Sequence, residues 1–505
     1  MTGAPVMESF SLTAALVDRL SLIEEYSISA DERRTIRALL LDYIAVCAEG
    51  SRSESASAMC RSAMTIAPSG AMMPVIGAGH DLPGTAAAMV NAVAGHTTEF
   101  DDVHNASSSH PGVVIFSALF GGVAQTAEID DASMLKAVII GYEAMCRVGR
   151  AANPAAQYAR HFHPTATVGA IGAAATASRL LRLSRTQTVW SLGIAADLAA
   201  GGLQFLVDGA WTKRLHPAIA ARNGLDAALL AAEGFVGTED GIGGEHGFLA
   251  TYTDSSDRPL LLAGWPNSPL EVTQTSIKAH ACCRYKQGPI DALIAIRVEH
   301  HLEISDVQSI EIGLPTVAIP IVAEPTDAKR RPKSVVDAQF SMAFGAAVAI
   351  VHGRAGPREY VQEALNDDRI LALMDRVMCV GDPSLDVEYP RRWRSWVQVT
   401  TRSGSVYRMV TDEPKGDPGN PLTTAELAAK FNELAEPVYD DATRVKIVDA
   451  VGHFGEPGAF QNLVVALRST RPDTSRTLDN PGRSHYCLTL TQMPVGGGFT
   501  GGYNA

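Results

Sequence analysis

The sequence lacks the features that mark nucleic-acid-binding, secreted and membrane proteins. Its 505 residues include 42 Lys and Arg against 55 Asp and Glu, and the formal net charge is −13. A polyanionic partner needs clustered basic side chains, which the chain does not show, so we expect no nucleic-acid partner. The N-terminus has neither the basic start nor the apolar core of a signal peptide, and no run of about eighteen apolar residues predicts a membrane span. These absences predict a cytoplasmic protein with no membrane partner.

Cysteines are few and show no framework spacing. The chain has 7, an odd number, and Cys282 and Cys283 form the close pair. Adjacent cysteines rarely form a disulfide, and a structural zinc site needs a second pair at suitable spacing, so we expect reduced thiols and no zinc. P-loop and dinucleotide fingerprints are missing as well. The sequence therefore offers no motif for a nucleotide or a structural metal.

Apolar residues recur every three or four positions through the first half of the chain. The segments with this spacing are 30–50, 84–96, 131–150 and 222–237. Two more segments, 168–183 and 187–203, are so rich in Ala and Gly that their helices should approach closely and be buried. Residues 1–268 are therefore predicted to form a helical bundle.

The pattern changes after residue 268. Residues 307–314 alternate apolar and polar positions, and residues 395–410 hold two alternating runs joined by a Ser-Gly turn, so antiparallel strands are expected. Helices are predicted from near Val336 to residue 353 and over 367–378. Residues 269–412 are thus expected to form an α+β unit.

The chain is then predicted to return to the helical part. Two helical patterns follow the α+β unit, at 422–437 and 441–454. The predicted fold class is therefore mainly α, with a discontinuous all-helical domain over 1–268 and 413–467 and a smaller α+β domain over 269–412. Residues 468–505 are rich in Ser, Thr, Arg, Pro and Gly, which predicts a flexible tail.

Titratable side chains concentrate in TTEFDDVHNASSSHPG, residues 97–112, directly after a predicted helix. The C-terminus of a helix carries partial negative charge, so Glu99, Asp101 and Asp102 cost stability there unless they are capped or paired. The segment could be a solvated loop, a metal site built from carboxylates and histidines, or an acid–base cluster. The residues alone leave these three interpretations open.

Three further segments carry histidines and basic residues near predicted helix starts. They are RHFHPTATVGA with His161 and His163, WTKRLHPAIAARNG with Lys213, Arg214 and His216, and SIKAHACCRYKQGPIDA with Lys278, His280 and Arg284. Basic residues at a helix N-terminus oppose the helix dipole, which indicates an anion held between them. The second and third segments could therefore bind carboxylates.

Taken together, these segments resemble the successive signature blocks of the MmgE/PrpD family. GFVGTEDGIGGEHGF and RPKSVVDAQFSMAFGAAVAI extend the resemblance, which runs in order from about residue 10 to about residue 455. The resemblance implies a large all-helical domain closed by a smaller α+β lid, in a homodimer. It implies no metal and no organic cofactor.

The family contains 2-methylcitrate dehydratase, cis-aconitate decarboxylase and iminodisuccinate epimerase. The resemblance therefore implies a cofactor-independent lyase that acts on a small polycarboxylate, through carbanion or enolate chemistry next to a carboxylate. Its reaction would be a dehydration or a decarboxylation. An epimerase of an iminodisuccinate-like substrate and a catalytically silent paralogue that binds a polycarboxylate are the alternatives.

The family's active-site positions are carried over onto five residues of this chain: Asp101, His110, His163, Lys213 and Lys278. Our hypothesis is that His163 and Lys213 handle the proton and the developing enolate. Lys278 would then hold a substrate carboxylate, and Asp101 would orient His110 or another donor. The further candidates for substrate binding are Tyr158, His104, His216, Cys283 and Arg284.

The chain differs from the mammalian-type aconitate decarboxylases that it resembles at several positions. Those enzymes have a histidine at Cys283, a threonine at Val103 and a tyrosine near Ala328, and many relatives have a histidine at Gln287. By contrast, TEFDDVH and KAHACCR resemble the fungal decarboxylases. The choice of polycarboxylate therefore stays open.

Overall fold

The computed structural model describes residues 10–66, 70–126 and 129–471. The described residues up to Thr470 belong to one compact unit. Most of the predicted tail, from residue 472 onward, lies outside the described residues. The prediction of a mainly α fold is confirmed, because helices dominate the described chain and a four-stranded sheet lies in its C-terminal half.

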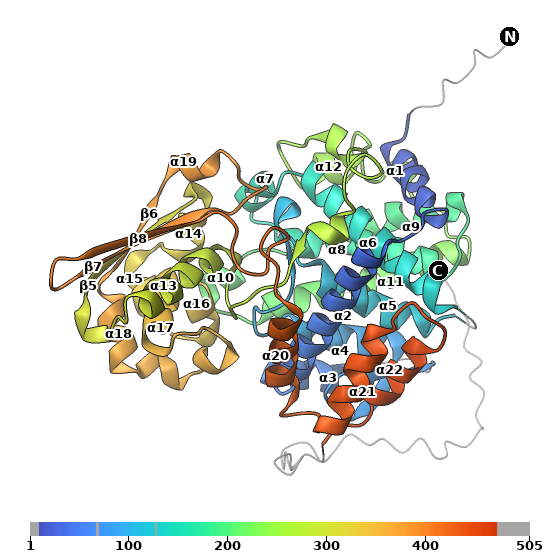
Figure 1. Ribbon diagram of the computed structural model, residues 1–505. Coiled ribbons are helices and arrows are strands. Elements are labelled where there is room, and N and C mark those ends of the chain that lie inside the picture. Colours follow the sequence, from blue (N-terminus) through green and yellow to red (C-terminus); the bar gives the residue numbers. More distant parts are fainter. Residues whose placement is uncertain (1–9, 67–69, 127–128, 472–505) are drawn as a thin grey trace, which may run out of the picture. The chain divides into compact units, whose positions relative to one another are not determined.

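Long helices build the N-terminal half of the chain (Figure 1). They are α2 (Ala30–Gly50), α4 (Gly84–Gly95), α5 (Pro111–Val123), α6 (Asp131–Ala151), α8 (Pro164–Leu180), α9 (Arg185–Asp197) and α11 (Thr212–Ala232). Small residues let α8 and α11 approach closely. A Cβ on Gly224 would lie 2.4 Å from Ala173 Cβ and 2.7 Å from Ala170 O, so only glycine fits there.

Shorter helices complete the helical part and connect it to the sheet. They are α1 (Leu12–Ser21), α3 (Glu54–Ile66), α7 (Pro154–Ala159), α10 (Phe205–Asp208), α12 (Phe248–Thr251), α14 (Ile319–Val322), α15 (Thr326–Arg330) and α19 (Pro383–Asp386). Among the described residues, none of these helices or the longer ones combines the length and the apolar character that crossing a membrane would require.

Two small sheets include strands of the first 268 residues, which the sequence pattern predicts to form a helical bundle. Strands β1 (Met72–Val75) and β2 (His80–Pro83) pair in an antiparallel hairpin. Gly77 and Gly79 in its turn have φ of +78° and +71°, which favours glycine. Strand β3 (Val103–His104) pairs with β4 (Thr275–Ser276). This short pairing brings the acidic segment beside the chain that leads to Lys278.

The main sheet has the strand order β6-β5-β7-β8. It contains β5 (Val307–Leu314), β6 (Val377–Gly381), β7 (Ser395–Thr401) and β8 (Val406–Thr411). The predicted antiparallel hairpin is confirmed as β7 and β8, while β6 runs parallel to β5. Helix α13 (Gln287–Glu299) packs on β7 and β8, and α17 (Met342–His352) packs against α13 and β6 (Figure 1).

Two predicted helices of this half differ in the structure. The helix expected from near Val336 to residue 353 is divided into α16 (Val335–Gln339) and α17, because Ser341 leaves helical geometry and its side chain caps the amide of Phe344. The second predicted helix ends at Met374, as α18 (Asp368–Met374), and the chain continues into β6. Strand pairing with β5 overrides the local helical pattern there.

After β8 the chain returns to the helices of the N-terminal half. The last three helices are α20 (Thr424–Ala435), α21 (Asp441–Gly452) and α22 (Ala459–Leu467). Helices α20 and α21 contact α2, and Lys430 of α20 forms a buried ion pair with Asp42 of α2 at 2.6 Å. The domain limits 1–268 with 413–467, and 269–412, stay a prediction.

Candidate active site

The acidic segment starts directly after α4 and is buried except at Thr98 and Ala106, which are half-buried. Asp102 accepts hydrogen bonds from the amide of Gly112 at 2.9 Å, at the start of α5, and from the Tyr142 hydroxyl at 2.8 Å. Burial, followed by the charge of Asp101, raises the pKa of the Asp102 carboxyl to about 8. Asp102 therefore caps α5 as a protonated acid at neutral pH. A solvated loop, one of the three interpretations of this segment, is ruled out by this burial.

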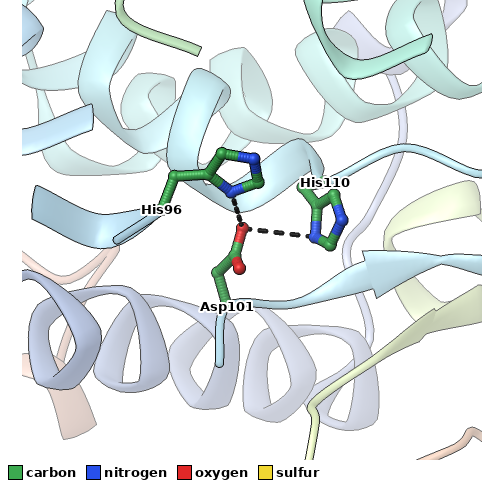
Figure 2. Close-up of side chains that lie close together, drawn as sticks. All are labelled: His96, Asp101 and His110. Atoms are coloured by element: carbon green, nitrogen blue, oxygen red, sulfur yellow. Dashed lines mark hydrogen bonds and ion pairs between the residues drawn. The ribbon is translucent and has the colours of Figure 1, made fainter. Parts of the chain in front are cut away.

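The Asp101 carboxylate lies between the rings of His96 and His110 and contacts both, as Figure 2 shows. Its Oδ2 lies 2.7 Å from His96 Nδ1 and 3.2 Å from His110 Nδ1. Burial opposes ionisation of Asp101, but the two histidines and Lys278 outweigh it and hold the pKa well below its usual range. Burial is also the main reason why the pKa of His110 falls to about 4. His110 Nδ1 lies closer still to the Asp102 carbonyl, at 2.6 Å, and because a carbonyl can only accept, a neutral His110 donates to that carbonyl. The ionised Asp101 carboxylate accepts from His96 and lies beside His110, and its orienting role stays a hypothesis.

The same three residues are the set that could hold a metal ion in the described part of the chain. One ligand atom each from His96, Asp101 and His110 lies within 4.8 Å of the other two, and all three residues are buried. However, the ammonium of Lys278 lies 3.8 Å from Asp101 Oδ1. A divalent cation in this position would meet that positive charge at close range, which favours hydrogen bonding over metal binding.

Two lysines converge on Glu99 from different parts of the chain. Lys213, in the first turn of α11, forms an ion pair with Glu99 Oε1. Lys278 donates to the Glu99 carbonyl at 2.9 Å and lies 3.7 Å from Oε2. Burial opposes ionisation of Glu99, but Lys213 and then Lys278 outweigh it and lower the pKa to about 2. The anion expected beside Lys213 is therefore a carboxylate of the protein itself.

His163 and His216 form a second histidine pair next to the lysines. His163 precedes α8, His216 belongs to α11, and their Nδ1 atoms are 3.0 Å apart. In this contact one Nδ1 donates and the other accepts. One neutral ring therefore carries its hydrogen on Nδ1 and the other carries it on Nε2. Burial lowers the pKa of His163 well below its usual range, and burial also lowers the pKa of His216 to about 4. Both rings are neutral near pH 7.

These groups surround a cavity of about 50 Å³, which we call the inner cavity. Its polar lining comprises Glu99, Ser108, His110, Tyr158, His163, Lys213, Cys283, Arg284 and Tyr285. Its apolar lining comprises Val103, Leu203, Phe205, Leu206, Ile321, Phe340 and Trp393. The space holds only a few water molecules, so a polycarboxylate requires some of these side chains to move.

Most of the predicted site residues lie at this cavity or directly behind its wall. His110, His163, Lys213, Tyr158 and Cys283 line it, as does Arg284. Behind the wall, Asp101 contacts His110, Lys278 contacts Glu99, and His216 contacts His163. His104 lies elsewhere, with its Nε2 3.0 Å from Glu271 Oε2.

Arg284 and Tyr158 are held by neighbouring polar groups. The Arg284 guanidinium donates to Asp417 Oδ1 at 2.5 Å and to Asn105 Oδ1 at 2.9 Å. The Tyr158 hydroxyl lies 3.1 Å from the Ser108 hydroxyl. Asp417 neutralises Arg284, and the ionised Glu99 and Asp101 balance the charges of Lys213 and Lys278. A ligand carboxylate must therefore compete with these protein carboxylates for the cations.

Sequence reasoning did not select Glu99, His96 or Phe340 as site residues. Glu99, unlike Asp101, lines the inner cavity, and the Lys213 ammonium lies 5.2 Å from the centre of the Phe340 ring. Glu99 and His96 stand in or beside the acidic segment, so their position in the sequence was a usable signal. Phe340 follows a break in a helix that the sequence pattern does not reveal.

Comparison with known proteins gives matches along most of the chain. Residues 18–260 match the MmgE/PrpD N-terminal domain and residues 280–453 match the MmgE/PrpD C-terminal domain. A cis-aconitate decarboxylase-like protein of Aspergillus oryzae is 29% identical, over 87% of this chain and 94% of its own. A cis-aconitate decarboxylase of Aspergillus terreus is 26% identical, over 87% and 92%. One of Mus musculus is 28% identical, over 70% and 72%.

Proposed function

Because the chain belongs to the MmgE/PrpD family, we propose that it is a cofactor-independent lyase that acts on a small polycarboxylate, as a decarboxylase of the cis-aconitate type. The relatives named cis-aconitate decarboxylases support a lyase-type function. The observation that carries the proposal is the convergence of Lys213 and Lys278 on one carboxylate beside His163 and His110 in a buried cavity.

Decarboxylation next to a carboxylate breaks one carbon–carbon bond and leaves an electron pair on the substrate. The pair spreads onto the remaining carboxylate, carbon dioxide departs, and one proton is added to carbon. Fixed cations in a water-poor site stabilise the developing charge. Lys213 and Lys278 supply these cations, and a substrate carboxylate competes with Glu99 for them.

The proton would come from the histidines. His110 and His163 are neutral without substrate, because burial lowers the pKa of each. A polycarboxylate bound within a few ångströms would raise both pKa values, since an opposite charge favours the imidazolium form. Substrate binding would then take up a proton, and His163, against the cavity, would deliver it to carbon. His216 would orient His163 through the Nδ1 contact.

The experiment mixes the purified protein with cis-aconitate, 2-methylcitrate, citrate and iminodisuccinate separately. Carbon dioxide release, enoate absorbance and optical rotation distinguish decarboxylation, dehydration and epimerisation. We expect carbon dioxide from cis-aconitate or a close analogue, with one deuterium in the product when the solvent is D₂O. Silence in all three measurements, together with no deuterium in recovered substrate, would instead indicate a polycarboxylate-binding protein.

We also propose that the chain forms a homodimer, on the basis of the family resemblance. Sedimentation equilibrium of the purified protein at micromolar concentration measures this directly. A mass of one chain across the accessible concentration range would contradict the proposal.

A further inference from the structure

A second and larger hollow lies next to the inner cavity. Its volume is about 740 Å³, and we call it the outer hollow. Four side chains line both spaces, namely Tyr158, Leu203, Leu206 and Ile321. These four side chains therefore form the partition between the charged inner cavity and the outer hollow.

The outer hollow has a mainly apolar lining. Apart from the partition, its apolar lining consists of Ala155, Ala159, Val207, Val317, Pro320, Pro325 and Ala328. Val207 is 78% exposed, so a large apolar side chain faces solvent at this place. The lining also contains the charged residues Glu324, Lys329, Arg331, Lys333 and Asp337 and the polar residue His161. The ammonium of Lys329 is already used, because it donates to the carbonyls of Ile321 and Phe340 at 2.7 and 2.9 Å.

The two spaces differ in size as well as in polarity. At about 50 Å³ the inner cavity is much smaller than a small-molecule site, whereas about 740 Å³ is an ordinary size for one. Leu203 and Leu206 lie at the short helix α10, and Ile321 lies on α14. A ligand that displaced these side chains would occupy a continuous site with a charged inner end and an apolar outer end.

From this arrangement we infer that the ligand is a polycarboxylate that carries an alkyl chain. The carboxylates lie in the inner cavity against Lys213 and Lys278, and the chain crosses the partition into the outer hollow. This inference rests on the proposed function for its charged end. The apolar end follows from the lining of the outer hollow, since burying methylene groups there removes apolar surface from water.

The test measures binding by calorimetry with 2-alkylcitrates that carry methyl, propyl or hexyl chains. Each methylene that is fully buried strengthens binding roughly fourfold. Because the outer hollow is partly open, we expect the Kd to fall by roughly thirtyfold in total from methyl to hexyl. Hexanoate, which has a chain and one carboxylate, should bind much more weakly than the hexyl compound.

Two variants fill the outer hollow from different helices. Ala328→Trp on α15 and Ala159→Trp on α7 replace exposed alanines, so neither disturbs the core. Each should remove the gain from the hexyl chain and leave the Kd of the methyl compound within about twofold of wild type, because the wide hollow rather than the charged cavity is blocked. Ala442→Trp, at an exposed position of α21, is the matched control and should change neither Kd.

A Kd that does not fall with chain length would overturn the inference, as would an equal loss of the hexyl gain in Ala442→Trp. Turnover of cis-aconitate is recorded with the same protein preparations, as carbon dioxide release. Turnover of cis-aconitate without any chain-length gain in binding overturns the inference alone. A chain-length gain without turnover of cis-aconitate contradicts the proposed function and leaves the ligand class supported.

Discussion

Two buried polar networks of this molecule differ in how completely their atoms are hydrogen-bonded. The Arg147 guanidinium donates to Glu143 Oε2 at 2.7 Å and to the carbonyls of Ala263 and Trp265 at 2.5 and 3.0 Å. In the network around Asp101, His96 Nε2 and Asp101 Oδ1 have no hydrogen-bond partner among the described residues. Unpaired buried polar atoms cost stability, so evolution retains them mainly where another role requires them.

The Arg147 network stabilises the fold, whereas the Asp101 network is arranged for a ligand. Glu143 Oε1 also accepts from the amide of Glu271 at 2.6 Å, so the Arg147 network ties α6 to the segment before β4. The Asp101 network instead borders the inner cavity and contains ionised and neutral groups held in one place. Substitutions in the first should therefore change stability, and substitutions in the second should change chemistry.

The largest effect is expected for Arg147→Met. Removing this side chain leaves Glu143 buried without its partner, which should lower the free energy of unfolding by about 3–5 kcal/mol. Denaturant unfolding measures the loss, and turnover per folded molecule should stay near the wild-type value. Arg185→Met is the control, because its pair with Asp18 is more than half exposed on both sides and should contribute below about 1 kcal/mol.

Lys213→Met should have its main effect on chemistry. Loss of one fixed cation next to the developing charge should lower kcat/KM by roughly 10²–10³-fold. The loss of stability should be smaller than for Arg147→Met, because Glu99 keeps Lys278 at 3.7 Å. Initial rates and denaturant unfolding are compared with those of Lys446→Met, an exposed position on α21. A fall in stability as large as that of Arg147→Met would make Lys213 a structural residue and remove the distinction between the networks.

The neutral histidines should make the site network sensitive to pH. Burial lowers the pKa of His216 from 6.5 to about 4 in the folded state. Between these values the unfolded chain binds the proton and the folded chain does not, so stability falls as the pH falls from 6.5 to 4. The loss is up to about 1.4 kcal/mol per pH unit for this histidine. Above pH 6.5 the contribution of His216 to the free energy of unfolding does not change with pH.

The measurement compares the free energy of unfolding of wild type and His216→Gln across that pH range. The raised pKa of Asp102 changes stability in the opposite direction. The protonated Asp102 carboxyl stabilises the folded state at low pH, and this stabilisation is lost as the pH rises through 8. Both proteins share this effect, so it cancels in the difference. The variant should show the flatter curve, whereas His246→Gln, at an exposed position, should parallel the wild type. If the free energy of unfolding of wild type and of His216→Gln changed in parallel with pH, the lowered pKa of His216 in the folded state would be contradicted.

Local patterns were enough to predict much of this structure. The three- and four-residue spacing predicted α2, α4, α6 and the second half of α11, but not α5 or the first half of α11. Alternation predicted β5 and the β7–β8 hairpin. The basic clusters predicted a bound anion, and in the structure the carboxylate beside Lys213 and Lys278 is that of Glu99. Binding of a substrate carboxylate by these lysines stays a prediction. These features depend on residues that are close in the sequence or on charges with a simple electrostatic preference.

The remainder depends on contacts that no local pattern contains. Strand β6 forms where β5 offers hydrogen bonds, although its residues continue a helical pattern. The helix break at Phe340 is tied to Lys329, whose ammonium binds the Phe340 carbonyl from a separate helix. The local pattern also does not show which acid of the acidic segment reaches the inner cavity. The backbone of Glu99 is left-handed, at φ +55°, and this conformation directs the chain toward the cavity.

The smallest expected effect is that of removing metal ions. His96, Asp101 and His110 offer three ligand atoms in one place, but the Lys278 ammonium beside Asp101 already supplies the positive charge that a cation would bring. Dialysis against a chelator should therefore leave turnover within about 10% of the untreated enzyme, and added Zn²⁺ should not increase it. Lys278→Met removes the competing charge, so this variant is where zinc binding would first become detectable by calorimetry. Activity that disappears with the chelator and returns with Zn²⁺ would mean that the unpaired atoms of this network serve a metal and not a carboxylate substrate.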